Sequence, residues 1–175
     1  MRRSVRTALS FSLALALGAS AAASDDGAAP AAGAGGVHVV FAHPERFTDV
    51  RDRPLGGVTA DDPALVELAR YVQSRAAPRL VAGQTLEVTI TDIDRAGQFE
   101  PRRGPNFDSV RVVRDVTPPR VDLAFRLLAA DGQVVRSGSR QLRDLNFLTR
   151  DVELRVDPLR HEKRLLADWI GRDLR

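Results

Sequence analysis

The sequence predicts an α+β fold, in which a mainly antiparallel sheet of about five strands carries two amphipathic helices on one face. Two observations lead to this fold class. Apolar residues recur at helical spacing after each of two Asp-Pro pairs. Several shorter segments alternate apolar and polar residues or are rich in β-branched residues, as half-buried strands are. The predicted order is β-α-β-β-β-β-α, and hairpin-linked strands favour antiparallel pairing.

Both predicted helices begin with an Asp-Pro pair, because Asp caps free N–H groups and Pro suits the first helical position. The first is predicted from Asp62-Pro63 to Ala77, before Pro78. The second starts at Asp157-Pro158, and we place His161 on its solvated polar face. The apolar faces are Leu65, Leu68, Ala69, Val72 and Ala76 in the first helix, and Leu159, Leu165, Leu166, Trp169, Ile170 and Leu174 in the second.

The strands are predicted from alternation and from turn residues. In the second strand Leu86, Val88 and Ile90 face one way. Asp131-Gly132 suits a tight hairpin turn between the last two strands. The segment 142–156 is ambiguous, and its apolar residues suggest that it packs against the domain. The predicted strands are 37–41, 85–90, 110–116, 121–127 and 134–141.

The N-terminus has the three regions of an export signal. Residues 1–23 combine arginines at positions 2, 3 and 6, a short apolar stretch at 9–17, and small residues at Ala21-Ala22-Ala23 that suit signal peptidase. Residues 24–36 read as a flexible Ala/Gly-rich leader, and 37–175 as a single α+β domain. We therefore expect a periplasmic or secreted protein. It would have no lipid anchor, because no cysteine follows the apolar stretch, and no transmembrane helix in the mature chain.

Charge and cysteine usage exclude several classes of site. The chain has 26 basic and 23 acidic residues, and loss of residues 1–23 would leave 23 of each. A balanced charge argues against a nucleic-acid partner. Without cysteine, no site that depends on thiolate is possible. We predict no cofactor.

The loop 95–108 is the first candidate site, because it is long for a compact domain. Phe99 and Phe107 flank Arg102 and Arg103. Aromatic rings and guanidinium groups together hold carboxylates, phosphates or sugar rings. The alternative is that the phenylalanines anchor the loop to the core while both arginines remain in water.

Asp92 and Asp94 form a second candidate site at the end of a strand. Residues two apart in a strand share a face, so the pair suits a hard cation or hydrolysis by two carboxylates. Continued alternation places both on the side of Leu86, Val88 and Ile90. The alternative is a strand that ends or bulges near Thr91, with the aspartates capping the loop or pairing with arginines such as Arg95 or Arg120.

No catalytic residue and no metal ligand is predicted elsewhere. The three histidines, His38, His43 and His161, lack the spacing of a zinc site. Ser137 and Ser139 lie in a predicted strand and not on a nucleophile elbow.

Several short motifs resemble one family across nearly the whole domain. They lie at 44–49 (PERFTD), 91–97 (TDIDRAG), 118–120 (PPR), 142–144 (LRD) and 162–169. In this order they are similar to the proteobacterial periplasmic family known as domain of unknown function 3016. The resemblance implies an exported single-domain protein, and it assigns no activity, cofactor, partner or site residue.

The sequence thus favours a non-catalytic binding or interaction module of the cell envelope, whose partner is an envelope protein or a small anionic ligand. One alternative is a small hydrolase or cation-binding protein that uses Asp92 and Asp94. Another is a subunit of an envelope assembly, with an exposed apolar patch at Leu145, Phe147 and Leu148.

Overall fold

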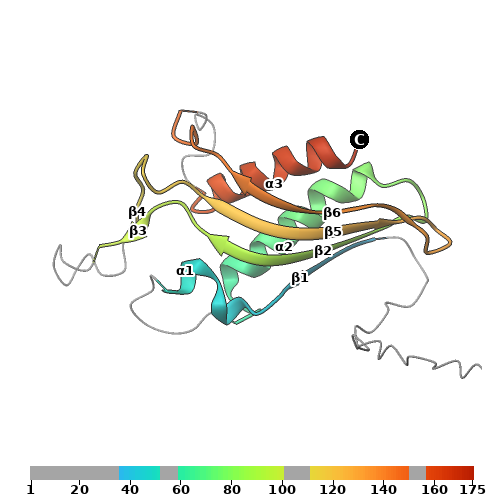
Figure 1. Ribbon diagram of the computed structural model, residues 1–175, viewed down its shortest axis with the longest axis horizontal. Helices are drawn as coiled ribbons and strands as arrows, with labels where there is room; N and C mark the ends of the chain where they lie inside the picture. Colours follow the sequence, from blue (N-terminus) through green and yellow to red (C-terminus); the bar gives the residue numbers. More distant parts are fainter. Residues whose placement is uncertain (1–35, 52–58, 101–110, 150–156) are drawn as a thin grey trace, which may run out of the picture. The chain divides into compact units, whose positions relative to one another are not determined.

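A four-stranded mixed sheet forms one layer of the fold, and two long helices form the other (Figure 1). The structure is a computed structural model that describes residues 36–51, 59–100, 111–149 and 157–175. All of these lie within one compact unit, residues 32–175. The predicted signal peptide and all but the last residue of the predicted leader lie outside the described residues. The strands of the sheet, in spatial order, are β1 (Val37–Phe41), β2 (Thr85–Asp94), β5 (Arg120–Leu128) and β6 (Val134–Arg143).

The predicted α+β class is confirmed, but the sheet is mixed. β1 pairs with β2 in parallel, whereas β2, β5 and β6 pair in antiparallel fashion. The parallel pair follows from the connection, because a helix lies between β1 and β2 and such crossovers join parallel strands. The described part of the predicted strand 110–116 contributes only β4 (Arg111–Val112), which pairs with β3 (Gln98–Phe99) in a separate two-stranded ribbon. The main sheet therefore has four strands and not about five.

Helices α2 (Pro63–Ala76) and α3 (Arg160–Asp173) are the two predicted helices. Asp62 caps α2 as expected, since its carboxylate accepts a hydrogen bond of 2.9 Å from the Ala64 backbone N–H. α3 starts later than expected, because Asp157 binds the Leu159 N–H at 2.8 Å in a turn that precedes the helix. The shorter elements are η1 (Pro44–Arg46), α1 (Thr48–Arg51) and η2 (Ala77–Arg79).

The core lies between one face of the sheet and both long helices, as predicted (Figure 1). Leu68 of α2 and Leu166 of α3 are fully buried there. Trp169 of α3 meets the ring of Phe125 in β5 edge to face, with centroids 5.6 Å apart. Polar and charged side chains such as Glu87 point to the other face of the sheet, where an ion pair with Arg126 joins β2 to β5.

A bulge near Thr91 decides where the two candidate aspartates lie. The pairing of β2 with β5 shifts between Ile90 and Asp92, so Ile93 takes the next core position and is only 1% exposed. Because one residue has been added, Asp92 and Asp94 point to the face opposite the core. The prediction that they share the face of Ile90 is therefore wrong, and the bulge that we weighed as the alternative is present.

The end of α3 nearest its N-terminus is more buried than expected. His161 is 4% exposed, and the ring of Phe147 meets it edge to face at 4.7 Å, so its predicted solvated position is wrong. Phe147 is itself buried, which leaves Leu145 and Leu148 as the exposed members of the predicted apolar patch. Within the described residues, no helix has the length and apolar character to cross a membrane.

Candidate functional site

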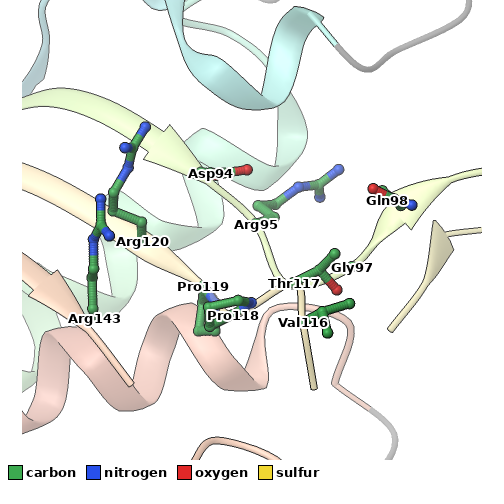
Figure 2. A pocket seen from close by; sticks show the side chains of 10 residues that line it. All are labelled: Asp94, Arg95, Gly97, Gln98, Val116, Thr117, Pro118, Pro119, Arg120 and Arg143. Carbon is green, nitrogen blue, oxygen red and sulfur yellow. The ribbon is translucent and has the colours of Figure 1, made fainter. Parts of the chain in front are cut away.

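A pocket of about 270 Å³ opens where β2 ends and β5 begins, beside the last residue of β6 (Figure 2). Three of its lining residues are arginines and one is an aspartate. A short segment that leads into β5 supplies apolar groups. The lining residues are Asp94, Arg95, Gly97, Gln98, Val116, Thr117, Pro118, Pro119, Arg120 and Arg143.

Two of the arginines lie directly opposite each other on neighbouring strands. Arg120 of β5 and Arg143 of β6 are register partners, and Figure 2 shows their side chains side by side and pointing the same way. Like charges at opposed positions of an antiparallel pair repel each other. Arg120 is neutralised by Asp92, at 2.5 Å from Nη2 to Oδ2. Arg143 is exposed and forms no ion pair with any described residue, so it carries the unneutralised positive charge of this pair.

Both oxygens of Asp92 are already occupied. Oδ1 accepts a hydrogen bond from the Thr48 backbone N–H, and Oδ2 accepts one from the Thr48 hydroxyl, each at 2.7 Å. Arg120 also donates to that hydroxyl at 2.8 Å. Asp92 therefore joins the start of α1 to β2 and β5, which is the structural role that we weighed against a cation site. The part of the chain that the structure describes contains no group of three or more His, Asp or Glu residues that could hold a metal ion.

A second arginine group supports the other wall of the pocket. Asp49 is 5% exposed and accepts hydrogen bonds from Arg95 Nε at 3.1 Å and Arg111 Nη2 at 2.5 Å. Arg111 also donates to the carbonyl oxygens of Arg95 and Gly97, and its guanidinium lies 4.7 Å from the centre of the Phe99 ring. These contacts hold the segment from Arg95 to Phe99 in place.

Gly97 brings this wall against the segment that leads into β5. Its φ is +82°, and a Cβ there would lie 2.6 Å from the Val112 carbonyl oxygen, so no other residue fits without rearrangement. The Gly97 N–H donates to the carbonyl of Thr117 at 3.0 Å. The pocket is therefore closed on this side by backbone contacts.

Glu162 ties α3 to the same wall from the core side. It is 1% exposed, and its Oε1 accepts a hydrogen bond of 2.8 Å from the Ala96 backbone N–H. Oε2 has no hydrogen-bond partner among the described residues. Burial raises the pKa of Glu162, and the hydrogen bond from Ala96 offsets this only in part.

The predicted site residues are only partly brought together. Phe99 contacts the guanidinium of Arg111, which was not among the predicted site residues. The other three predicted residues of this loop, Arg102, Arg103 and Phe107, lie outside the described residues. The pocket contains Asp94, without Asp92.

Sequence reasoning missed the pairing of Arg120 with Arg143, although a signal for it exists. Counting equal numbers of residues outward from Asp131-Gly132 places Arg120 opposite Arg143. The structure has this register despite an irregularity near Leu128.

Residues 35–172 match the model of a family described as "Protein of unknown function (DUF3016)". This match confirms the family resemblance that the motifs indicate. No curated protein and no solved structure matches the chain.

Proposed function

Because the chain belongs to the DUF3016 family, whose description names no activity, we propose its role from its own geometry. The protein is an exported, non-catalytic binding module of the cell envelope. Its pocket at the ends of β2, β5 and β6 takes a small anionic ligand.

The observation that carries this proposal is the opposed pair of Arg120 and Arg143. Asp92 forms an ion pair with one guanidinium, while the other has no ion-pair partner among the described residues and lies opposite a like charge. An anion that accepts hydrogen bonds from Arg143 removes this repulsion and gains a charge-assisted contact. The fold therefore places at the pocket a guanidinium that forms no ion pair with a described residue, although the carboxylate of Asp94 lies in the same lining.

The proposed location rests on the N-terminal residues. An arginine-rich start, an apolar stretch and small residues around Ala23 occur in the order that signal peptidase substrates show. Production of the full chain in a Gram-negative host should place a form that begins near Ser24 in the periplasmic fraction. Retention of residues 1–23 on a cytoplasmic product would contradict export.

The alternative that uses Asp92 and Asp94, as a hydrolase or a cation-binding protein, has weaker support. Asp92 already accepts hydrogen bonds on both oxygens, and Asp94 is the one acid among the described residues that line the pocket. A rise of the melting temperature in millimolar calcium that disappears in Asp92→Asn would favour the alternative instead.

Binding is tested by calorimetric titration of acetate into the purified protein. Arg143→Gln should weaken acetate binding about tenfold or more, which is the value of a charge-assisted hydrogen bond. Arg75→Gln is the matched control, since Arg75 is exposed on α2 and forms no ion pair within the described residues. Equal affinities for the two variants would refute the proposal.

A further inference from the structure

We infer that the anion is the carboxylate of a small monoanion with an apolar body. This inference rests on the proposed function and names the class of ligand for the same pocket. It follows from the number of charges, the hydrogen-bond donors, the apolar wall and the volume of the pocket.

The balance of charge favours a ligand with one negative charge. The described carboxylates around the pocket are those of Asp49, Asp92 and Asp94, and they balance all but one of the positive charges on the described arginines there, which are Arg95, Arg111, Arg120 and Arg143. Arg143 forms no ion pair with a described residue. A second negative charge on the ligand would have no matching cation among the described residues. Dianions such as phosphate monoesters are therefore disfavoured.

The donors at the pocket suit a carboxylate better than a phosphate or sulfate. Phosphate sites usually surround several oxygens with backbone N–H groups. Here Pro118 and Pro119 have no N–H, while the N–H groups of Gly97 and Thr117 are already bonded to carbonyl oxygens. The fork of a single guanidinium, that of Arg143, matches the two oxygens of one carboxylate.

An exposed apolar wall lies across the pocket from the charge. Val116 is 76% exposed and adjoins the rigid pair Pro118 and Pro119. Figure 2 shows Val116 on a different side of the pocket from the guanidinium groups of Arg120 and Arg143. A ligand that touches both sides has its charge at one end and an apolar body at the other, and burial of Val116 against that body adds affinity.

The volume is sufficient for a small organic body. A space of about 270 Å³ equals that of about nine liquid water molecules at ~30 Å³ each. This accommodates a ligand of about ten non-hydrogen atoms, which is the size of an aromatic or cyclic carboxylic acid.

The test compares benzoate, acetate and inorganic phosphate as probes in calorimetric titrations of the purified protein. Benzoate should bind about tenfold more tightly than acetate, because it adds apolar contact, and more tightly than phosphate. Val116→Ser should weaken benzoate binding roughly threefold and leave acetate unchanged. Val81→Ser, at a residue that is 69% exposed outside the pocket, is the matched control and should change neither. Arg143→Lys should weaken the binding of both acetate and benzoate, since an ammonium group lacks the forked pair of N–H donors of a guanidinium.

The outcomes separate this inference from the proposed function. If acetate binds but benzoate binds no more tightly, or if phosphate binds best, the inference is overturned and anion binding stands. If Val116→Ser and Val81→Ser behave alike, the apolar wall has no role and the inference fails. If none of the three anions binds, both the inference and the proposed function fail.

Discussion

The two arginine groups beside the pocket differ in how their charges are balanced. Arg95 and Arg111 both donate to one carboxylate, that of Asp49, which is buried with them. In the second group, Asp92 forms an ion pair with Arg120, while Arg143 lies at the pocket without an ion-pair partner among the described residues. The comparison teaches that residue type alone does not mark a binding residue. Arg95 and Arg111 join segments of the fold through the carboxylate of Asp49, while Arg143, which has no ion-pair partner among the described residues, is the arginine that we propose for a ligand.

Removal of the shared carboxylate should have the largest effect on stability. Asp49→Asn removes the carboxylate that two largely buried guanidinium groups share, and we expect a loss of about 3–5 kcal/mol in the free energy of unfolding. Urea denaturation measures it. The control is Asp61→Asn, at an exposed residue that forms no ion pair with a described residue, and it should change stability by no more than about 0.5 kcal/mol. Similar losses in both variants would contradict a special role for Asp49.

Asp92→Asn should lower stability less and strengthen anion binding. The neutral amide no longer balances Arg120, and we expect a loss of about 1–3 kcal/mol in the free energy of unfolding. Because Arg120 then adds a second positive charge to the pocket, acetate should bind several-fold more tightly. An unchanged or weaker affinity in a folded variant would show that Arg120 does not act on the ligand.

Glu162 supports the wall of the pocket, but its buried carboxyl group should lower the free energy of unfolding as the pH rises. Burial raises its pKa in the folded protein, so the unfolded chain loses this proton first. Above the unfolded pKa of about 4.3, the folded state therefore binds more protons, and stability falls by up to about 1.4 kcal/mol per pH unit until the folded pKa is passed.

The substitution Glu162→Gln keeps an oxygen for the Ala96 N–H and removes the ionisable proton. Urea denaturation at several pH values should show the variant gaining stability over the wild type as the pH rises from about 4.5. Parallel curves for the two proteins would show that Glu162 titrates as it does in the unfolded chain.

The smallest effect on stability is expected at Arg143. Without ligand, Arg143→Gln removes a repulsion between opposed strands and should raise the free energy of unfolding by about 0.2–1 kcal/mol, although it weakens anion binding. A gain in stability together with a loss of anion affinity is diagnostic, because replacement of a structural arginine would lower the stability of the protein. A loss of stability comparable with that of Asp49→Asn would place Arg143 in the same class as Arg111.

The local parts of this fold were predictable from the sequence. The cap at Asp62 and the apolar spacing of α2 act within one or two turns, so the start of the helix appears where expected. The predicted helix between β1 and β2 allowed a parallel pair, but the choice of β2 as the neighbour of β1 was not predictable, because partners far apart in sequence determine it. The burial of His161 likewise depends on Phe147, which arrives from a different segment.

The features of the candidate site likewise divide into local ones that the sequence predicts and tertiary ones that it does not. The bulge at Thr91 could be anticipated, since Ile90 and Ile93 are three apart where alternation requires two. The sharing of Asp49 between Arg95 and Arg111 could not, because it joins three segments that only tertiary packing brings together. The sequence led to a prediction of ligand binding by Arg102 and Arg103, which lie outside the described residues, and it did not point to the arginines that line the pocket.

The most direct test of the account observes the side chains of the arginines themselves. In nitrogen-15 spectra of the protein, the Nε–H signals of Arg143, Arg95 and Arg111 are followed while acetate is added. The Arg143 signal should shift and saturate, while the signals of Arg95 and Arg111, which Asp49 holds, should stay in place. Saturating shifts of equal size at all three, or none at Arg143, would contradict it.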